Sequence, residues 1–150
     1  MRYVDAAEMS DLMELAARYW ACADGDASER IEDLFTDDAV LQLGNLALEG
    51  RAAIVKFFAD RDAAQRIAQR TTRHVACNHR VTGRQGDRVT VCSTVMVYAG
   101  VGAIPLESGV VTGIADFRDD CVKSAQGEWR FARRAGGSIF VGPGAASFAR

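Results

Sequence analysis

The sequence lacks the features that mark several large classes of protein. Its 150 residues hold 18 Lys and Arg against 20 Asp and Glu, a formal net charge of −2. That balance argues against a dedicated nucleic-acid binder, which shows a basic excess, and against attraction to an anionic membrane surface. No run of about 18 apolar residues is present, so no membrane-spanning helix is expected. The N-terminus also lacks the apolar core of a signal peptide.

Motifs for metal, phosphate and nucleophilic chemistry are missing as well. The four cysteines, at positions 22, 77, 92 and 121, form no CxxC pair, so we expect reduced thiols in a cytoplasmic protein. No HExxH motif or Cys/His cluster supplies metal ligands, and no G-x-S-x-G element supplies a nucleophile. The glycine-rich stretch from 136 to 144 has no Gly-Lys-Ser/Thr element. We therefore expect no metal and no cofactor.

What the chain contains is the composition of one globular domain, with 49% apolar and 25% charged residues. The apolar period is helical in the first part of the chain and changes to two after Thr71. Helices followed by strands are typical of an α+β fold. We predict one domain over 1–150, with helices in 1–35, a helix at 51–69, an antiparallel meander at 72–135 and a C-terminal arm at 136–150. The expected strands are 39–43, 46–49, 72–83, 88–99, 106–118 and 128–135.

Local signals fix the ends of the first helix. Asp5 stands three residues before Glu8, as in a capping box. Gly25 follows the last residue of the apolar period and is a suitable C′ residue. Asp24 would then lie at the end of this helix, beside an apolar face. The helix dipole and burial would raise its pKa, and a protonated histidine nearby would lower it.

Two histidines are candidates for acid–base chemistry. By strand alternation, His79 shares the more apolar face with Val75, whereas His74 shares the other face with Ala76. Their offset of five residues places them on opposite faces of a regular strand, which also argues against a shared metal. Periodicity favours His79 as the buried histidine, and a bulge would change the assignment. From the residues alone, both histidines remain candidates.

Three groups of segments resemble the SnoaL-like branch of the nuclear-transport-factor-like superfamily. They are YWACADGD (19–26) with LFTDDAV (34–40), LEGRAAI (48–54) with Phe57 and Phe58, and TRH (72–74) with Asn78 and the late GEWRF (127–131). The resemblance implies a cone-shaped α+β barrel, in which N-terminal helices pack in a curved antiparallel sheet around an apolar pocket. This cystatin-like architecture agrees with the order of helices and strands predicted above.

The resemblance also implies a chemistry. Asp24 and His74 look like the Asp–His pair of scytalone dehydratases and hexachlorocyclohexane dehydrochlorinases, which remove a proton and expel a leaving group without a cofactor. His74 would be the base and Asp24 would orient it, because histidine titrates near working pH. Tyr19 or Tyr98 would polarise a carbonyl or assist the leaving group. The stretch 40–43 holds no acid, unlike the matching strand of ketosteroid isomerases.

The leading hypothesis is thus a lyase, dehydratase-like, or an isomerase acting on a small apolar substrate, cyclic or aromatic in the simplest case. Residues expected to line its pocket or bind substrate are Trp20, Phe57, Phe58, Asn78, Met96, Val110 and Thr112. A second hypothesis is a non-catalytic binding or assembly domain, since the chain is also similar to small subunits of ring-hydroxylating dioxygenases. A third is an epoxide hydrolase or cyclase, which needs an extra acid in the pocket. The resemblance further implies a homodimer or homotrimer.

Overall fold

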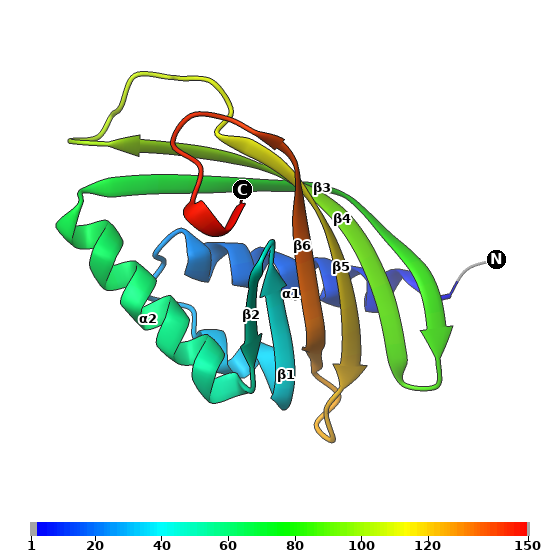
Figure 1. Cartoon of the computed structure of the whole chain (residues 1–150). Coiled ribbons are helices and arrows are strands. Elements are labelled where there is room, and N and C mark those ends of the chain that lie inside the picture. The colour runs from blue at the N-terminus through cyan, green and yellow to red at the C-terminus, as the bar shows by residue number, and fades with distance from the viewer. Residues whose placement is uncertain (1–2, 150) are drawn as a thin grey trace.

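The structure, a computed structural model, describes residues 3–149 (Figure 1). It contains two α-helices, two short 3-10 helices and six strands, so the predicted α+β fold is confirmed. In chain order the elements are α1 (Ala6–Ala23), η1 (Ile31–Leu34), β1 (Phe35–Leu43), β2 (Leu46–Glu49), α2 (Arg51–Ile67), β3 (Arg70–Gln85), β4 (Arg88–Val101), β5 (Gly113–Lys123), β6 (Trp129–Val141) and η2 (Ser147–Ala149).

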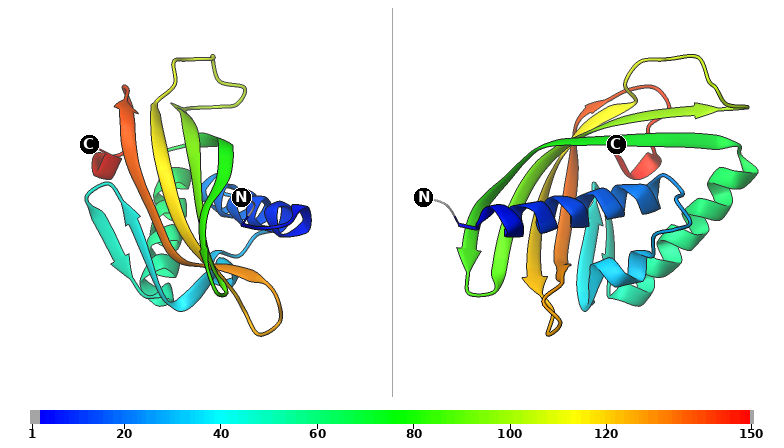
Figure 2. Two further views of the ribbon diagram at one scale, coloured as in Figure 1. Left: turned by 90° about the vertical axis from the view of Figure 1, so that its right-hand side faces the viewer. Right: turned by 180° about the vertical axis from the view of Figure 1, so that it is seen from behind.

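The strands form a single sheet in the order β2-β1-β6-β5-β4-β3. Every neighbouring pair is antiparallel except β1 and β6, which are parallel. The sheet curves around α1, while α2 packs against β1, β2 and the first part of β3 (Figure 2). After β6, residues 142–149 reach α2 and the turn between β1 and β2, where Phe148 contacts Phe57 and Gly44. The curved sheet and the helices α1 and α2 all contribute side chains to the hydrophobic core between them.

The predicted ends of α1 are confirmed. Asp5 accepts a hydrogen bond from the Glu8 amide at 2.8 Å, and Glu8 reaches back to the Asp5 amide, which completes a capping box. Gly25 follows the helix with φ +84°, a conformation that L side chains rarely adopt. The backbone amide of Asp24, the C-cap residue, donates a hydrogen bond to the carbonyl oxygen of Trp20. These contacts fix where the Asp24 side chain leaves the helix.

Aromatic side chains fill the space between α1 and the sheet. Tyr19 meets Phe35, Phe58 and Phe131 edge-to-face, with ring centroids 5.5–6.1 Å apart. Arg134 is fully buried beside these rings and pairs with Asp119 at 2.8 Å. Close packing continues up to Gly136, where a Cβ would overlap the Phe117 ring. This interior is rigid on the side of α1 that faces β6 and β5.

Three predicted boundaries are wrong. The segment 36–38, which lies between the helices predicted in 1–35 and the strand predicted from 39, belongs to β1, because 31–34 is a single 3-10 turn and Phe35 already pairs with β6. The strand expected from 106 begins at Gly113, since most of the preceding residues from Pro105 onward are exposed. Residues 136–141, expected in an arm, extend β6 and pair with β5 up to Gly113 and Val141. Only 142–149 remains as a C-terminal segment.

Three further features bear on the nature of the protein. No helix in residues 3–149 is long and apolar enough to cross a membrane. The four cysteines are unpaired, with Cys121 buried and the other three half-buried. Within the same range, His, Cys, Asp and Glu side chains form no group of three that could hold a metal ion.

Candidate active site

Asp24 and His74 form a hydrogen-bonded pair inside the fold. The Nδ1 atom of His74 lies 2.6 Å from Oδ1 of Asp24, and the two side chains are 10% and 13% exposed. The His74 amide donates to Oδ2 at 2.9 Å, and the Thr72 hydroxyl donates to Oδ1 at 2.9 Å. Three contacts therefore hold the carboxylate, and both the backbone and the ring of His74 are anchored to it.

These contacts set the charge state of Asp24. Burial alone would raise its pKa, but the hydrogen bonds from His74 and Thr72 outweigh burial and hold the pKa below its ordinary value. An ionised Asp24 makes Nδ1 the donor of the ring, which leaves Nε2 as the basic nitrogen. Nε2 has no hydrogen bond with any residue from 3 to 149 and is not sealed from solvent. The ring thus presents Nε2, its basic nitrogen, to a cavity that His74 helps to line.

Trp20 fixes the plane of this ring. Its indole stacks on the imidazole with centroids 4.6 Å apart and planes 15° from parallel. Trp20 is also held edge-on by Tyr19 and Phe117, with centroids 4.8 and 5.1 Å away. The ring is therefore positioned by a hydrogen bond to Asp24 on one atom and by an aromatic stack on one face.

A β-bulge decides which histidine belongs to the site. Between Cys77 and Arg80, β3 carries one residue more than β4 opposite it, and Asn78 takes φ +55°. The extra residue reverses the alternation, so His74 before the bulge and His79 after it both point inward. His79 is half-buried beside Arg134, and burial, followed by that positive charge, lowers its pKa. His79 does not line the cavity that contains His74.

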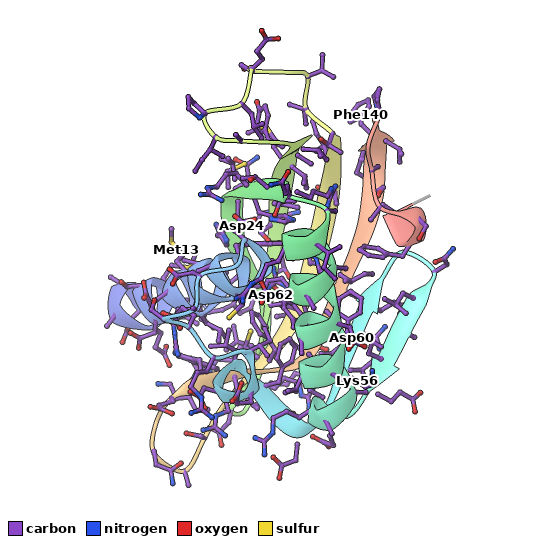
Figure 3. The ribbon with its side chains drawn as sticks, turned by 90° about the vertical axis from the view of Figure 1, so that its left-hand side faces the viewer. Met13, Asp24, Lys56, Asp60, Asp62 and Phe140 are labelled. Atoms are coloured by element: carbon purple, nitrogen blue, oxygen red, sulfur yellow. The ribbon has the colours of Figure 1, made fainter. Side chains whose placement is uncertain are left out.

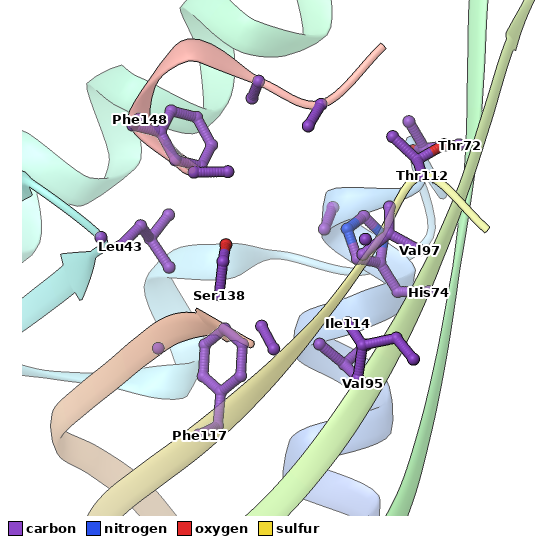
Figure 4. Close-up of a pocket in the computed structure, with 18 of the residues that line it drawn as sticks. Leu43, Thr72, His74, Val95, Val97, Thr112, Ile114, Phe117, Ser138 and Phe148 are labelled. Atoms are coloured by element: carbon purple, nitrogen blue, oxygen red, sulfur yellow. The ribbon is translucent and has the colours of Figure 1, made fainter. Parts of the chain in front are cut away.

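The cavity beside His74 has a volume of about 140 Å³. That is enough for a small organic molecule, since one water needs only about 10–15 Å³ on the same measure. Val95, Val97, Ile114 and Phe117 come from the sheet, and Phe148 closes the cavity from the C-terminal segment (Figure 4). Its lining is mostly apolar, and Tyr19, Thr72, Thr112 and Ser138 are the neutral lining residues that carry a hydroxyl group.

The structure brings six of the predicted site residues other than Asp24 to this cavity. They are Tyr19, Trp20, Phe57, Phe58, His74 and Thr112. Asp24 lies behind His74 and reaches the cavity through it.

Four predicted site residues lie elsewhere, and these predictions are wrong. Tyr98 and Met96 pair across the sheet with Arg73 and Val75, whereas the inward position on β4 is Val97 opposite His74. Their side chains therefore point to the convex face. Val110 is 74% exposed in the loop before β5, and Asn78 is exposed at the bulge. The sequence shows that side chains alternate between the two faces of β4. It does not show which of them share a face with His74, because that depends on the register between β4 and β3.

Among the cavity residues that sequence reasoning missed are two arginines, Arg61 and Arg70. Arg61 lies on α2 and Arg70 opens β3, and both line the cavity. The guanidinium of Arg61 donates to the carbonyl of Ala23, which is 38 residues away in the chain. No local pattern marks such a contact, because the carbonyl oxygen that Arg61 binds lies at the end of another helix, α1.

The curved sheet, the enclosed helices and the buried histidine at an apolar cavity define a class of small α+β barrels. A family model described as a SnoaL-like domain matches residues 4–135, so the chain belongs to the SnoaL-like family. No curated protein matches the sequence.

Solved structures agree with this assignment of the fold. ActVI-ORFA from Streptomyces coelicolor superposes with a TM-score of 0.78 at 16% identity, over 93% of this chain and 100% of that one. A candidate aromatic ring hydroxylase from Novosphingobium aromaticivorans gives 0.77 at 22% identity, over 98% and 99%. A candidate scytalone dehydratase from the same organism gives 0.70 at 21% identity, over 94% and 96%. At these identities the likeness establishes the fold alone.

Proposed function

We propose that this protein is a cofactor-independent lyase or isomerase that removes a carbon-bound proton from a small, largely apolar substrate. The observation that carries the proposal is the 2.6 Å contact between His74 and Asp24 at the wall of an apolar cavity. A histidine with one nitrogen bound to a carboxylate and the other unoccupied has the arrangement of a general base. The likeness in fold to a candidate scytalone dehydratase supports the same class of reaction.

The proposed step uses this chain's residues as follows. Nε2 of His74 takes the proton, and the electrons of the broken C–H bond form a carbon–carbon double bond. In an elimination the leaving group departs with its own electron pair, and in an isomerisation the proton returns to a different carbon. Asp24 stabilises the imidazolium that forms on His74, because its carboxylate is already bound to Nδ1.

Tyr19 is the residue to which we assign proton donation at the cavity. Burial raises its pKa to about 12, so its hydroxyl keeps its proton at neutral pH. A protonated hydroxyl can donate to a carbonyl or to a departing oxygen. Of the two tyrosines predicted for this role, Tyr19 alone lines the cavity, so the role falls to it in our proposal.

The third hypothesis, an epoxide hydrolase or cyclase, loses its main support. It needs an extra acid in the pocket, and no Asp or Glu lines the cavity within residues 3–149. The non-catalytic hypothesis differs from our proposal in a measurable way, because an assembly domain has no need of a basic nitrogen at the cavity.

The test uses 5-nitrobenzisoxazole, an apolar probe whose ring opens to a coloured phenolate when a base removes its one acidic C–H proton and the N–O bond breaks. We expect the protein to accelerate this reaction, and His74→Ala to reduce the rate by about 10²–10⁴-fold, the usual contribution of a general base. His79→Asn is the matched control, since His79 faces inward but does not line the cavity. A His74→Ala protein that folds and keeps its rate would eliminate the proposal and favour the binding-domain reading.

A further inference from the structure

Two arginines interrupt an otherwise neutral cavity. Arg61, from the middle of α2, and Arg70, from the start of β3, both contribute to its lining. They are also close enough for the charge of Arg70 to lower the pKa of Arg61, in the same direction as burial does. Placing two cations at one apolar cavity is unfavourable unless an anion accompanies them.

Residues 3–149 offer no such anion. No carboxylate within residues 3–149 forms an ion pair with either Arg61 or Arg70. The two acids whose charges reach Arg61 are Asp24 and Asp62, which lie at the end of α1 and on α2 (Figure 3). Asp24 is bound to His74 and Thr72, and Asp62 is paired with Arg66 at 2.9 Å.

The contacts that Arg61 and Arg70 do make position them without neutralising them. Arg61 uses Nη1 to reach the carbonyl of Ala23 and the side chain of Gln65, and its Nε and Nη2 have no partner among the described residues. Arg70 uses Nη2 to reach the carbonyl of Gly144 at 3.0 Å. Both guanidinium groups are therefore anchored by neutral oxygens and retain donors for a ligand. A guanidinium binds a carboxylate through two parallel hydrogen bonds, which makes it the natural partner for such a group.

We propose that the substrate carries a carboxylate that binds to Arg61 and Arg70, next to the Asp24–His74 pair. This inference rests on the proposed function for its use of the cavity and goes beyond it by naming the substrate class, a small apolar acid. Because Arg61 is tied to Ala23, the residue before Asp24, a bound carboxylate would lie near the base and fix which carbon faces Nε2. Arg61 and Arg70 are then positioning residues for the substrate.

The test compares two probes of equal shape, 2-naphthoate and 2-naphthamide, by isothermal titration calorimetry. We expect the wild-type protein to bind the carboxylate at least about tenfold more tightly than the amide, since a charge-assisted pair is worth at least that factor. The preference should weaken as salt concentration rises. Equal binding of the two probes by the wild-type protein would overturn the inference, and this measurement needs no variant.

Variants assign the preference to the residues. Arg61→Met removes the charge while keeping a long side chain, and it should abolish the preference for the acid; Arg61→Lys should retain part of it. Arg66→Met is the matched control, because Arg66 lies on the same helix and is 72% exposed. If Arg66→Met loses the preference as fully as Arg61→Met, the assignment to Arg61 is wrong.

The same experiment separates this inference from the proposed function. His74→Ala should keep the preference for 2-naphthoate even though it stops opening 5-nitrobenzisoxazole. If His74→Ala still opens 5-nitrobenzisoxazole, His74 is not the base and the proposed function is wrong. If the wild-type protein shows no preference for 2-naphthoate, only the inference about the substrate class is wrong.

Discussion

At the scale of single residues, the Asp24 carboxylate has two functions that can be measured separately. It orients His74 through Nδ1, and it joins the end of α1 to β3 through the His74 amide and Thr72. Asparagine keeps the shape of the side chain and loses its charge. We expect Asp24→Asn to slow opening of 5-nitrobenzisoxazole by at least about tenfold, because the ring loses its preferred tautomer and the imidazolium its counter-charge. An unchanged rate would mean that His74 acts without Asp24.

The same carboxylate makes stability depend on pH. Its pKa is lower in the folded protein than its ordinary value of 3.8, so the folded state binds this proton less tightly than the unfolded chain. The stability that it contributes is therefore complete above about pH 3.8 and is lost as pH falls through the lower pKa. Urea denaturation over a range of acid pH should show the wild-type advantage over Asp24→Asn shrinking in that direction. A constant difference across the range would contradict this account.

The residue scale also shows what sequence reasoning could reach. Asp24 and His74 were found because a family resemblance names both positions. The cavity position of Trp20 and Phe58 follows from their place on apolar helix faces. The position of Arg61 at the cavity could not be predicted. Its guanidinium binds the backbone carbonyl of Ala23, and a backbone carbonyl leaves no signal in the sequence.

At the scale of elements, the bulge in β3 controls the composition of the interior. A regular strand would send His74 and His79 to opposite faces, as the period of two predicts. The extra residue around Asn78 brings both inward, and the sequence showed no sign of it apart from asparagine itself, which tolerates positive φ better than most residues. Met96 and Tyr98 were predicted to face the cavity for a related reason. The register of β4 with β3 decides which side chains of β4 face inward, and the sequence does not show that register.

Substitutions at Asn78 test the bulge. Asn78→Gly should fold with little change, because glycine adopts φ +55° without strain. Asn78→Val should lower the free energy of unfolding by roughly 1–2 kcal/mol, the cost of a left-handed conformation for such a residue. Asn78 is exposed and lines no part of the His74 cavity, so a stable valine variant would mean that the bulge is not held by its backbone conformation. Chemical denaturation of both variants provides the comparison.

At the scale of the whole molecule, the cavity is closed by the end of the chain. Phe148 packs against Phe57 with centroids 6.1 Å apart, and its carbonyl lies against Gly44, where a Cβ would overlap it. Arg70 holds the same segment through Gly144. The buried hydrophobic core does not include this segment, since its residues all come from positions 12–131.

Ending the chain after Pro143 should therefore leave the fold intact and open the cavity. We expect thermal unfolding close to that of the full chain, and 2-naphthamide to bind at least several-fold more weakly, because the amide owes its affinity to apolar burial alone. The amide is the suitable probe here, since the truncation also frees Arg70. Collapse of the truncated protein would mean that residues 144–150 are needed for folding, and unchanged affinity would mean that they do not cover the ligand.

The residues that hold His74 and the segment that covers the cavity are separate parts of the chain, and this separation affects how the protein can evolve. His74 is held by a hydrogen bond to Asp24, a stacked indole and a paired strand, so a mutation there affects folding and the proposed chemistry together. The cover is a short terminal segment attached to the barrel by a few contacts. Replacement of residues 142–149 can alter which molecules enter the cavity while the contact between Asp24 and His74 stays as it is, so a change of ligand specificity would begin in this segment.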